Sequence, residues 1–302
     1  MPLWKYNLNR LCGLALVGLA ITLFAPKTAF ADSDEQSLLE RGTYLMNSIV
    51  ACGNCHTLRG TDGRQIDGME LAGGFVIEEA MFTAVVPNIT PDVATGVGGW
   101  SDDELIRAIR EGIRPDGTVI GPIMAFGFYR NLSDTDARAI VAYIRSVPAV
   151  SNATGASEYK FMLPPAYGPP VGSVPDPDRS DKVAYGAYLA GPAGHCLECH
   201  TPFNPAVMRP DYENRLGAGG FQFTGPGGAI VVSANITPDM ETGIGGWTDD
   251  EIKNAITQGV RPDGARLNPP MAFDYYARMN AEDVGALIAY LRSMKPIKNA
   301  VR

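Results

Sequence analysis

Two short segments of the 302-residue sequence each place two cysteines beside a histidine. The segments are Cys52-Gly53-Asn54-Cys55-His56 and Cys196-Leu197-Glu198-Cys199-His200. Two thiols three positions apart on one turn can form thioethers to the two vinyl groups of a porphyrin, and the next histidine can lie under the iron as its proximal ligand. This spacing is the attachment sequence for c-type haem. The sequence therefore predicts two covalently attached haem c groups, with His56 and His200 as iron ligands.

Other uses of paired cysteines explain less of this pattern. A dithiol redox centre needs the Cys-x-x-Cys spacing but gives no role to the following histidine. A zinc site built from four thiolates leaves both histidines idle. Two structural disulfides are compatible with an exported protein but also ignore the histidines. These three alternatives stay open at the level of sequence, although none accounts for both histidines.

The position opposite each histidine is filled by a second ligand, with methionine, lysine, asparagine and tyrosine as candidates, or it stays open. The chain has only one other histidine, His195, which directly precedes Cys196 and is therefore tethered on the proximal side of its own haem. Histidine thus cannot be the second ligand at both irons. An internal repeat pairs Met124 with Met271, both in Pro-x-Met-Ala-Phe segments, and the other methionines have no counterpart. A thioether opposite imidazole favours Fe(II). We therefore expect Met124 and Met271 to be iron ligands, the alternative being ordinary core packing.

The internal repeat covers most of the chain. Residues 88–147 align with residues 235–294 without a gap, and about half of the aligned positions are identical. Residues 151–180, which are rich in proline, glycine and serine, interrupt the repeat. The sequence thus predicts two haem domains, residues 32–150 and 181–302, joined by a linker at 151–180.

Helical patterns surround each motif. Apolar positions at helical spacing predict a helix that ends at each Cys-x-x-Cys-His motif. Capping boxes that start at Ser101 and Thr248 predict short helices closed by glycine, and a last helix follows an N-cap residue in each copy. The expected helices are 34–51, 101–112 and 133–147, repeated as 182–190, 248–259 and 280–294. Because no alternating strand pattern competes, the expected fold class is all-α.

Several residues have supporting roles to be tested. Gly42 and Gly186 would let the first helix of each copy cross closely against the last, with Tyr44 and Tyr188 nearby, although ordinary core packing explains them equally. The candidate donors to haem propionates are Trp100, Trp247, Asn88, Asn235, Arg114 and Arg261, and surface turns are the competing interpretation.

Residues 1–31 have the layout of a secretory signal peptide. Lys5 and Arg10 precede an uncharged run over 11–25, and Ala31 ends a small-residue cleavage site. The run is shorter than the roughly 20 apolar residues of a spanning helix, so we expect cleavage after Ala31, with an uncleaved membrane anchor as the alternative. The formal net charge of -8 argues against the basic surface that nucleic acid or an anionic membrane would require.

Taken together, the sequence resembles the class I cytochromes c, and specifically the multihaem cytochrome c subunits of membrane-associated periplasmic alcohol and sugar-acid dehydrogenases. The resemblance rests on both haem motifs, the Gly-Gly-Phe segments at 73 and 219, the Asn-Ile-Thr-Pro-Asp segments at 88 and 235, and the Pro-x-Met-Ala-Phe loops. It implies two tandem class I cytochrome c domains, with thioethers at Cys52, Cys55, Cys196 and Cys199 and His/Met ligation of both irons.

Saturated coordination favours electron transfer over catalysis, because outer-sphere transfer needs no open position for a substrate. We expect a periplasmic dihaem cytochrome, not an enzyme, that takes single electrons from a dehydrogenase and passes them towards a terminal oxidase or another cytochrome. Membrane contact would come through a partner or an uncleaved signal. The alternative is a dihaem peroxidase with one open iron and a distal carboxylate or histidine. The similarity of the two copies and the lack of a spare histidine argue against it.

Overall fold

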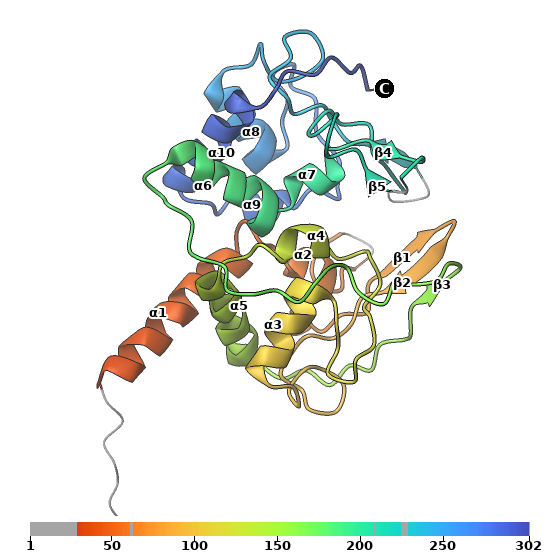
Figure 1. The fold of residues 1–302 in the computed structure, drawn as a ribbon, viewed down its shortest axis with the longest axis vertical. Coiled ribbons are helices and arrows are strands. Elements are labelled where there is room, and N and C mark those ends of the chain that lie inside the picture. Colours follow the sequence, from red (N-terminus) through yellow and green to blue (C-terminus); the bar gives the residue numbers. More distant parts are fainter. Residues whose placement is uncertain (1–28, 61–62, 208, 225–228, 302) are drawn as a thin grey trace, which may run out of the picture.

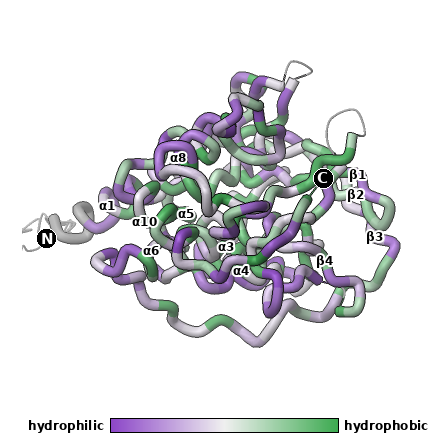
Figure 2. The backbone as a smooth tube through the Cα atoms, turned by 90° about the horizontal axis from the view of Figure 1, so that it is seen from above, coloured by the Kyte–Doolittle hydropathy of each residue, from purple (hydrophilic) through white to green (hydrophobic). Residues whose placement is uncertain are grey.

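The computed structural model describes residues 29–60, 63–207, 209–224 and 229–301, so most of the predicted signal peptide lies outside the described residues. Figure 1 shows two halves stacked along the long axis, with the first half below the second. The helices α1, α5, α6 and α10 gather on one side of the molecule and the strands on the other (Figures 1 and 2). Within the described ranges, none of the helices has the length and apolarity needed to cross a membrane.

The elements follow the repeat. The first half contains α1 (Ala29–Met46), α2 (Gly53–His56), β1 (Val76–Glu79), β2 (Phe82–Val85), α3 (Asp102–Glu111), α4 (Phe126–Tyr129), α5 (Asp134–Ser146) and β3 (Glu158–Tyr159). The second half contains α6 (Lys182–Tyr188), η1 (Leu189–Ala193), α7 (Cys196–Cys199), β4 (Phe203–Asn204), β5 (Arg209–Pro210), β6 (Gln222–Thr224), β7 (Ile230–Val232), α8 (Asp249–Gln258), α9 (Phe273–Tyr276) and α10 (Ala281–Ser293).

The predicted helix boundaries at α3 and α8 are confirmed. The Ser101 side chain accepts the Glu104 backbone N–H while the Glu104 carboxylate accepts the Ser101 N–H, and Thr248 begins α8 with the same capping box. Each helix ends at a glycine in the left-handed region, with φ 69° at Gly112 and 63° at Gly259. Local capping residues therefore set both ends of these two helices.

A close helix crossing anchors each half. α1 packs against α5, and α6 packs against α10 in the same way. A Cβ atom at Gly42 would lie 1.9 Å from the Ala139 carbonyl oxygen, and one at Gly186 would lie 2.0 Å from the Ala286 carbonyl oxygen. Because no side chain fits at such a separation, glycine is required at both crossings, which favours the close crossing over the alternative of ordinary core packing.

The predicted all-α fold class is wrong. Helices make up about a third of the described residues, and strands and bridges make up about a tenth. The strands form three small antiparallel sheets in the orders β1-β2-β3, β4-β5 and β6-β7. In the largest sheet, Val76 pairs with Val85 and Glu79 with Phe82, so a two-residue turn joins β1 to β2. These strands have only two to four residues, too short to show a clear alternation of apolar and polar positions.

The segment 151–180 packs closely on the first half. Its strand β3 pairs with β2, and the Tyr167 ring stacks on Phe126 with the ring centroids 4.9 Å apart. The Arg130 guanidinium, at the end of α4, donates to the Pro169 carbonyl at 2.7 Å. The segment predicted as a linker is therefore ordered and packs against the first half, next to the loop that contains Met124.

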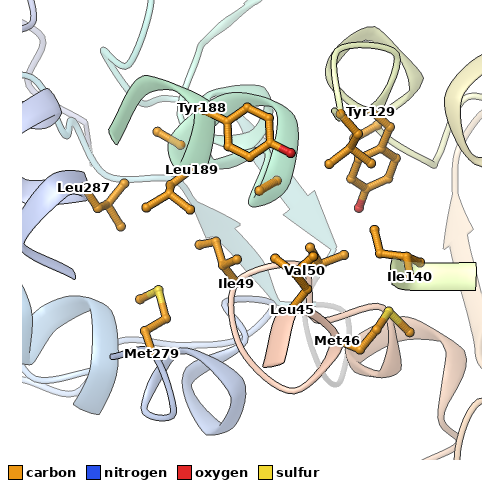
Figure 3. Packing of buried hydrophobic residues seen from close by; sticks show 14 of the residues in the cluster. Leu45, Met46, Ile49, Val50, Tyr129, Ile140, Tyr188, Leu189, Met279 and Leu287 are labelled. Atoms are coloured by element: carbon orange, nitrogen blue, oxygen red, sulfur yellow. The ribbon is translucent and has the colours of Figure 1, made fainter. Parts of the chain in front are cut away.

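The hydrophobic core is continuous across the two halves. Leu45 and Ile49 from the end of α1 and the loop after it lie beside Leu189 and Leu287 of the second half (Figure 3), and all four belong to one cluster of buried residues. The two haem motifs, each at the end of this first-helix region, are therefore held to a common core.

Candidate haem sites

A single helical turn positions each attachment motif. Cys52 is the N-cap of α2, which runs from Gly53 to His56, and α7 spans Cys196–Cys199 with His200 directly after it. One turn brings positions i and i+3 to the same side of a helix, which is the relation that two thioethers to one porphyrin need. The residues before the motifs, Ala51 and His195, have φ of 48° and 39° and turn the chain into these helices.

Both candidate proximal histidines are oriented through their Nδ1 atoms. His56 Nδ1 lies 2.9 Å from the Pro87 carbonyl oxygen, and His200 Nδ1 lies 2.7 Å from the Ala234 carbonyl oxygen. A carbonyl only accepts, so Nδ1 carries the proton and Nε2 keeps its lone pair for a metal. Burial lowers the pKa of both imidazoles, which favours the neutral form that ligates iron. This donor set fits a haem iron at both places.

The cysteine environments do not fit the alternative uses. All four motif cysteines have free thiols, so neither disulfide is formed. Burial raises the pKa of Cys52 to about 12 and that of Cys196 to about 11. A dithiol redox centre needs a lowered thiol pKa, and here the shift is the opposite. Within the described part of the chain, no group of three or more His, Cys, Asp or Glu side chains could hold a metal ion, so the four-thiolate zinc site is not assembled either.

The two candidate methionines occupy equivalent loops. Met124 lies two residues before α4 and Met271 two residues before α9, and both are partly buried. In each loop the backbone closes a tight turn: Phe126 N–H donates to the Met124 carbonyl at 2.8 Å, and Phe273 N–H donates to the Met271 carbonyl at 3.0 Å. The same turn thus follows each methionine, while a cis peptide bond between Pro269 and Pro270 precedes Met271 only.

The two attachment motifs approach each other between the halves. Burial is the main cause that raises the pKa of Cys199 above its ordinary value, and the neighbouring Cys55 thiol of the other half adds to it. The pKa of the buried Tyr276 is raised well above its ordinary value, mainly by burial and further by the thiols of Cys196, Cys199 and Cys55, which come from both halves. Cys55 of the first half therefore contributes, as the smallest of the causes, to the raised pKa of two groups of the second half, Cys199 and Tyr276.

Sequence reasoning missed the residues that join the halves. Tyr44 was noted only as a neighbour of the Gly42 crossing, but its hydroxyl donates to Asp283 of the other half at 2.6 Å. The equivalent Tyr188 hydroxyl donates to Asp136 at 2.7 Å, so the two halves exchange the same contact. The repeat shows that these residues are equivalent, yet it does not say whether a tyrosine bonds within its copy or across to the other.

Asn88 is a structural residue and not a propionate donor. Its side-chain amide donates to the Val150 carbonyl at 2.7 Å and to Thr95 Oγ1 at 3.1 Å, and its oxygen accepts from Thr90. The residue is 2% exposed. Asn235 makes the equivalent bonds to Ile297, Thr242 and Thr237. Each asparagine ties the segment after the last helix back to its half.

Comparison with known proteins agrees with this site. Residues 37–144 match the family model of cytochrome c oxidase, cbb3-type, subunit III. The chain is 30% identical to the cytochrome c subunit of the quinone alcohol dehydrogenase of Gluconobacter oxydans, over 94% of this chain and 60% of that protein. It is 32% identical to the fructose dehydrogenase cytochrome subunit of Gluconobacter japonicus, over 85% of this chain and 52% of that protein.

A shorter relative matches over more of its own length. The chain is 28% identical to a diheme cytochrome c-type protein of Cereibacter sphaeroides, over 82% of this chain and 83% of that protein. By contrast, the chain spans about half to three fifths of the dehydrogenase cytochrome subunits above. These relatives are all named as cytochromes, in agreement with the prediction that the chain is a c-type cytochrome. The chain is a cytochrome c that resembles the cytochrome c subunits of alcohol and sugar-acid dehydrogenases.

Proposed function

We propose that this chain is a periplasmic cytochrome with two haem c groups, which takes single electrons from a dehydrogenase and passes them towards a terminal oxidase or another cytochrome. The observation that carries this proposal is the equal treatment of the two motifs, in which each buried histidine is held through Nδ1 on a backbone carbonyl. When bound, each haem supplies a one-electron Fe(III)/Fe(II) couple.

The chain's own residues have separate tasks in this function. Cys52 and Cys55 would attach one haem and Cys196 and Cys199 the other, with His56 and His200 as proximal ligands. The carbonyl acceptors Pro87 and Ala234 hold the imidazole rings and increase their basicity as ligands. Met124 and Met271 would complete the coordination, which leaves no position for a substrate and favours transfer through the haem edge.

The wider context of the proposal comes from the relatives. A dehydrogenase as electron donor is supported by the names of the alcohol, gluconate and fructose dehydrogenase cytochrome subunits. We also propose the boundaries expected above: a signal peptide cleaved after Ala31, domains at 32–150 and 181–302, and the segment 151–180 between them. Contact with the membrane would come through the partner or an uncleaved signal.

The number of haems is tested by mass. The chain is produced with a cytochrome c maturation system, and the intact mass and haem content are measured. We expect a polypeptide that begins at residue 32 and carries two haems, and a single haem when both Cys196 and Cys199 are replaced by alanine. A preparation of the unaltered chain that holds one haem would overturn the dihaem proposal.

The axial ligands are tested by spectroscopy of the oxidised protein. Methionine ligation gives a weak near-infrared band, which Met124→Ala and Met271→Ala should each reduce by half. Met240→Ala is the control, because Met240 is 73% exposed and should leave the band unchanged. A band that survives both ligand substitutions would refute the His/Met assignment, and a high-spin signal from one haem of the unaltered chain would favour the peroxidase.

A further inference from the structure

The attachment motif of the first half is bonded to the methionine loop of the second half. The side-chain amide of Asn54, inside the first Cys-x-x-Cys-His motif, donates from Nδ2 to the Pro270 carbonyl oxygen at 3.0 Å. Pro270 directly precedes Met271. One hydrogen bond therefore joins the residue between the cysteines of one haem site to the backbone beside the candidate ligand of the other.

Arg59 fixes which way the Asn54 amide points. Its Nη2 atom donates to Asn54 Oδ1 at 3.2 Å, and since a guanidinium only donates, the amide oxygen must face it. The Nδ2 group is then left to face Pro270. Arg59 also lies 3.8 Å from the Asp274 carboxylate in α9, although that carboxylate is 79% exposed and the ion pair adds little.

Two further contacts hold the same loop. Gln65 Nε2 donates to the Tyr275 hydroxyl at 2.6 Å. Gly53, the neighbour of Asn54, lies against that hydroxyl, and a Cβ atom at position 53 would be 2.3 Å from it. Residues 270–275 are thus held by polar groups of the first half on both sides of the turn that follows Met271.

The loop that contains Met124 is held differently. The position equivalent to Asn54 in the second motif is Glu198, whose carboxylate has no N–H to donate and lies 3.4 Å from His195 Nδ1 of its own half. Around Met124 the contacts are aromatic: Phe126 stacks on Tyr167, and Tyr129 meets the His195 ring edge-on at 5.4 Å. The repeat therefore offers an internal comparison for the role of Asn54.

We propose that Asn54 is a positioning residue for Met271. The strength with which Met271 holds its iron against a competing ligand then depends on the attachment motif of the first half. This inference rests on the proposed His/Met ligation. Its physical basis is that a methionine ligand stays bound only while its loop stays in place, and the Asn54 bond lowers the freedom of that loop. The Met124 loop has no such dependence on residue 198.

Imidazole is the probe, because it competes with methionine for ferric haem. In a Met124→Ala background, dilute imidazole first occupies the opened haem, and the remaining near-infrared band reports Met271 alone. Asn54→Asp keeps the size of the side chain but removes the donor. We expect the imidazole concentration that bleaches half of the band to fall about two- to fivefold, the effect of one solvent-accessible hydrogen bond. In the reciprocal Met271→Ala background, Asn54→Asp should leave the midpoint of the Met124 band unchanged.

The controls separate the two proposals. Glu198→Ala, at the equivalent position, should leave the Met124 midpoint within error in the Met271→Ala background. If the Met124→Ala protein has no methionine band at all, the His/Met assignment fails before Asn54 is tested. If the band is present and Asn54→Asp shifts neither midpoint, or shifts both equally, the positioning role is wrong while the ligation stands.

Discussion

The exchanged tyrosines make a prediction in which the two halves act as controls for each other. Tyr188→Phe removes a hydroxyl that donates to Asp136 at 2.7 Å and accepts the Ser133 backbone N–H at 3.2 Å. Tyr44→Phe removes the equivalent hydroxyl, which donates to Asp283 at 2.6 Å and accepts the N–H of Asn280 at 3.2 Å. The bonds match in number and kind, so burial decides the difference.

Burial is greater on the Tyr188 side. Ser133 is fully buried, so its N–H would lose its partner where water cannot replace it, whereas Asn280 is exposed. A lost bond to a charged group costs about 1.5–3 kcal/mol, and a buried unsatisfied donor adds about 1 kcal/mol or more. We expect Tyr188→Phe to lower the free energy of unfolding by about 3 kcal/mol and Tyr44→Phe by about 2 kcal/mol.

The assay is urea unfolding of the haem-loaded, oxidised protein, followed by far-ultraviolet circular dichroism and by haem absorbance. Because the core runs through both halves, we expect one transition that the two signals report at the same urea concentration. An equal cost of the two substitutions, or a larger cost for Tyr44→Phe, would refute the argument from burial. Two separate transitions in the unaltered protein would refute the shared core.

The remaining predictions concern the crossings, the alkaline limit and the buried asparagine. Gly42→Ala should cost about 3 kcal/mol or more in urea unfolding, because the new Cβ would meet the Ala139 carbonyl oxygen at 1.9 Å, while Gly99→Ala, whose Cβ would approach only Val93 at 4.0 Å, should cost little. Burial raises the pKa of Tyr143 to about 12 and that of Tyr185 to about 12. The unfolded chain therefore loses these protons first, and the free energy of unfolding should fall as pH rises from about 10 to 12, by at most about 1.4 kcal/mol per pH unit for each tyrosine. A Tyr185→Phe protein with an unchanged slope over that range would contradict this linkage. Asn88→Ala should lower the free energy of unfolding by about 3 kcal/mol, yet leave the near-infrared methionine band at full intensity, and a selective change in one reduction potential without loss of stability would point back to a propionate contact.

The sequence located the chemistry better than the architecture. The chemistry of Cys-x-x-Cys-His depends only on the spacing of residues within one turn, so it can be read from the sequence. The structure adds the carbonyl groups that face His56 and His200. The capped helices α3 and α8 were equally local and equally predictable. The sheets were not, because strands of two to four residues are too short to show an alternating pattern, and β3 from the expected linker pairs with β2 from much earlier in the chain.

The relation between the halves was beyond reach for a different reason. A repeat defines which residues are equivalent, and two copies can bond each within itself or reciprocally with the other. Tyr44 and Tyr188 have the same sequence context in either case, and only the packing of both halves on a shared core selects the reciprocal arrangement.

Reciprocal contacts between repeated halves also explain why the differences between the copies matter. Where the two copies have the same residues, as at the two tyrosine–aspartate hydrogen bonds, the contact is made twice and both sites have the same support. Where they differ, as at Asn54 and Glu198, a contact is made once and distinguishes the sites. Two haem sites with the same proximal histidine geometry can then differ in how firmly the opposite ligand is held. The asymmetry would arise from a contact across the interface that only one of the two motifs can make.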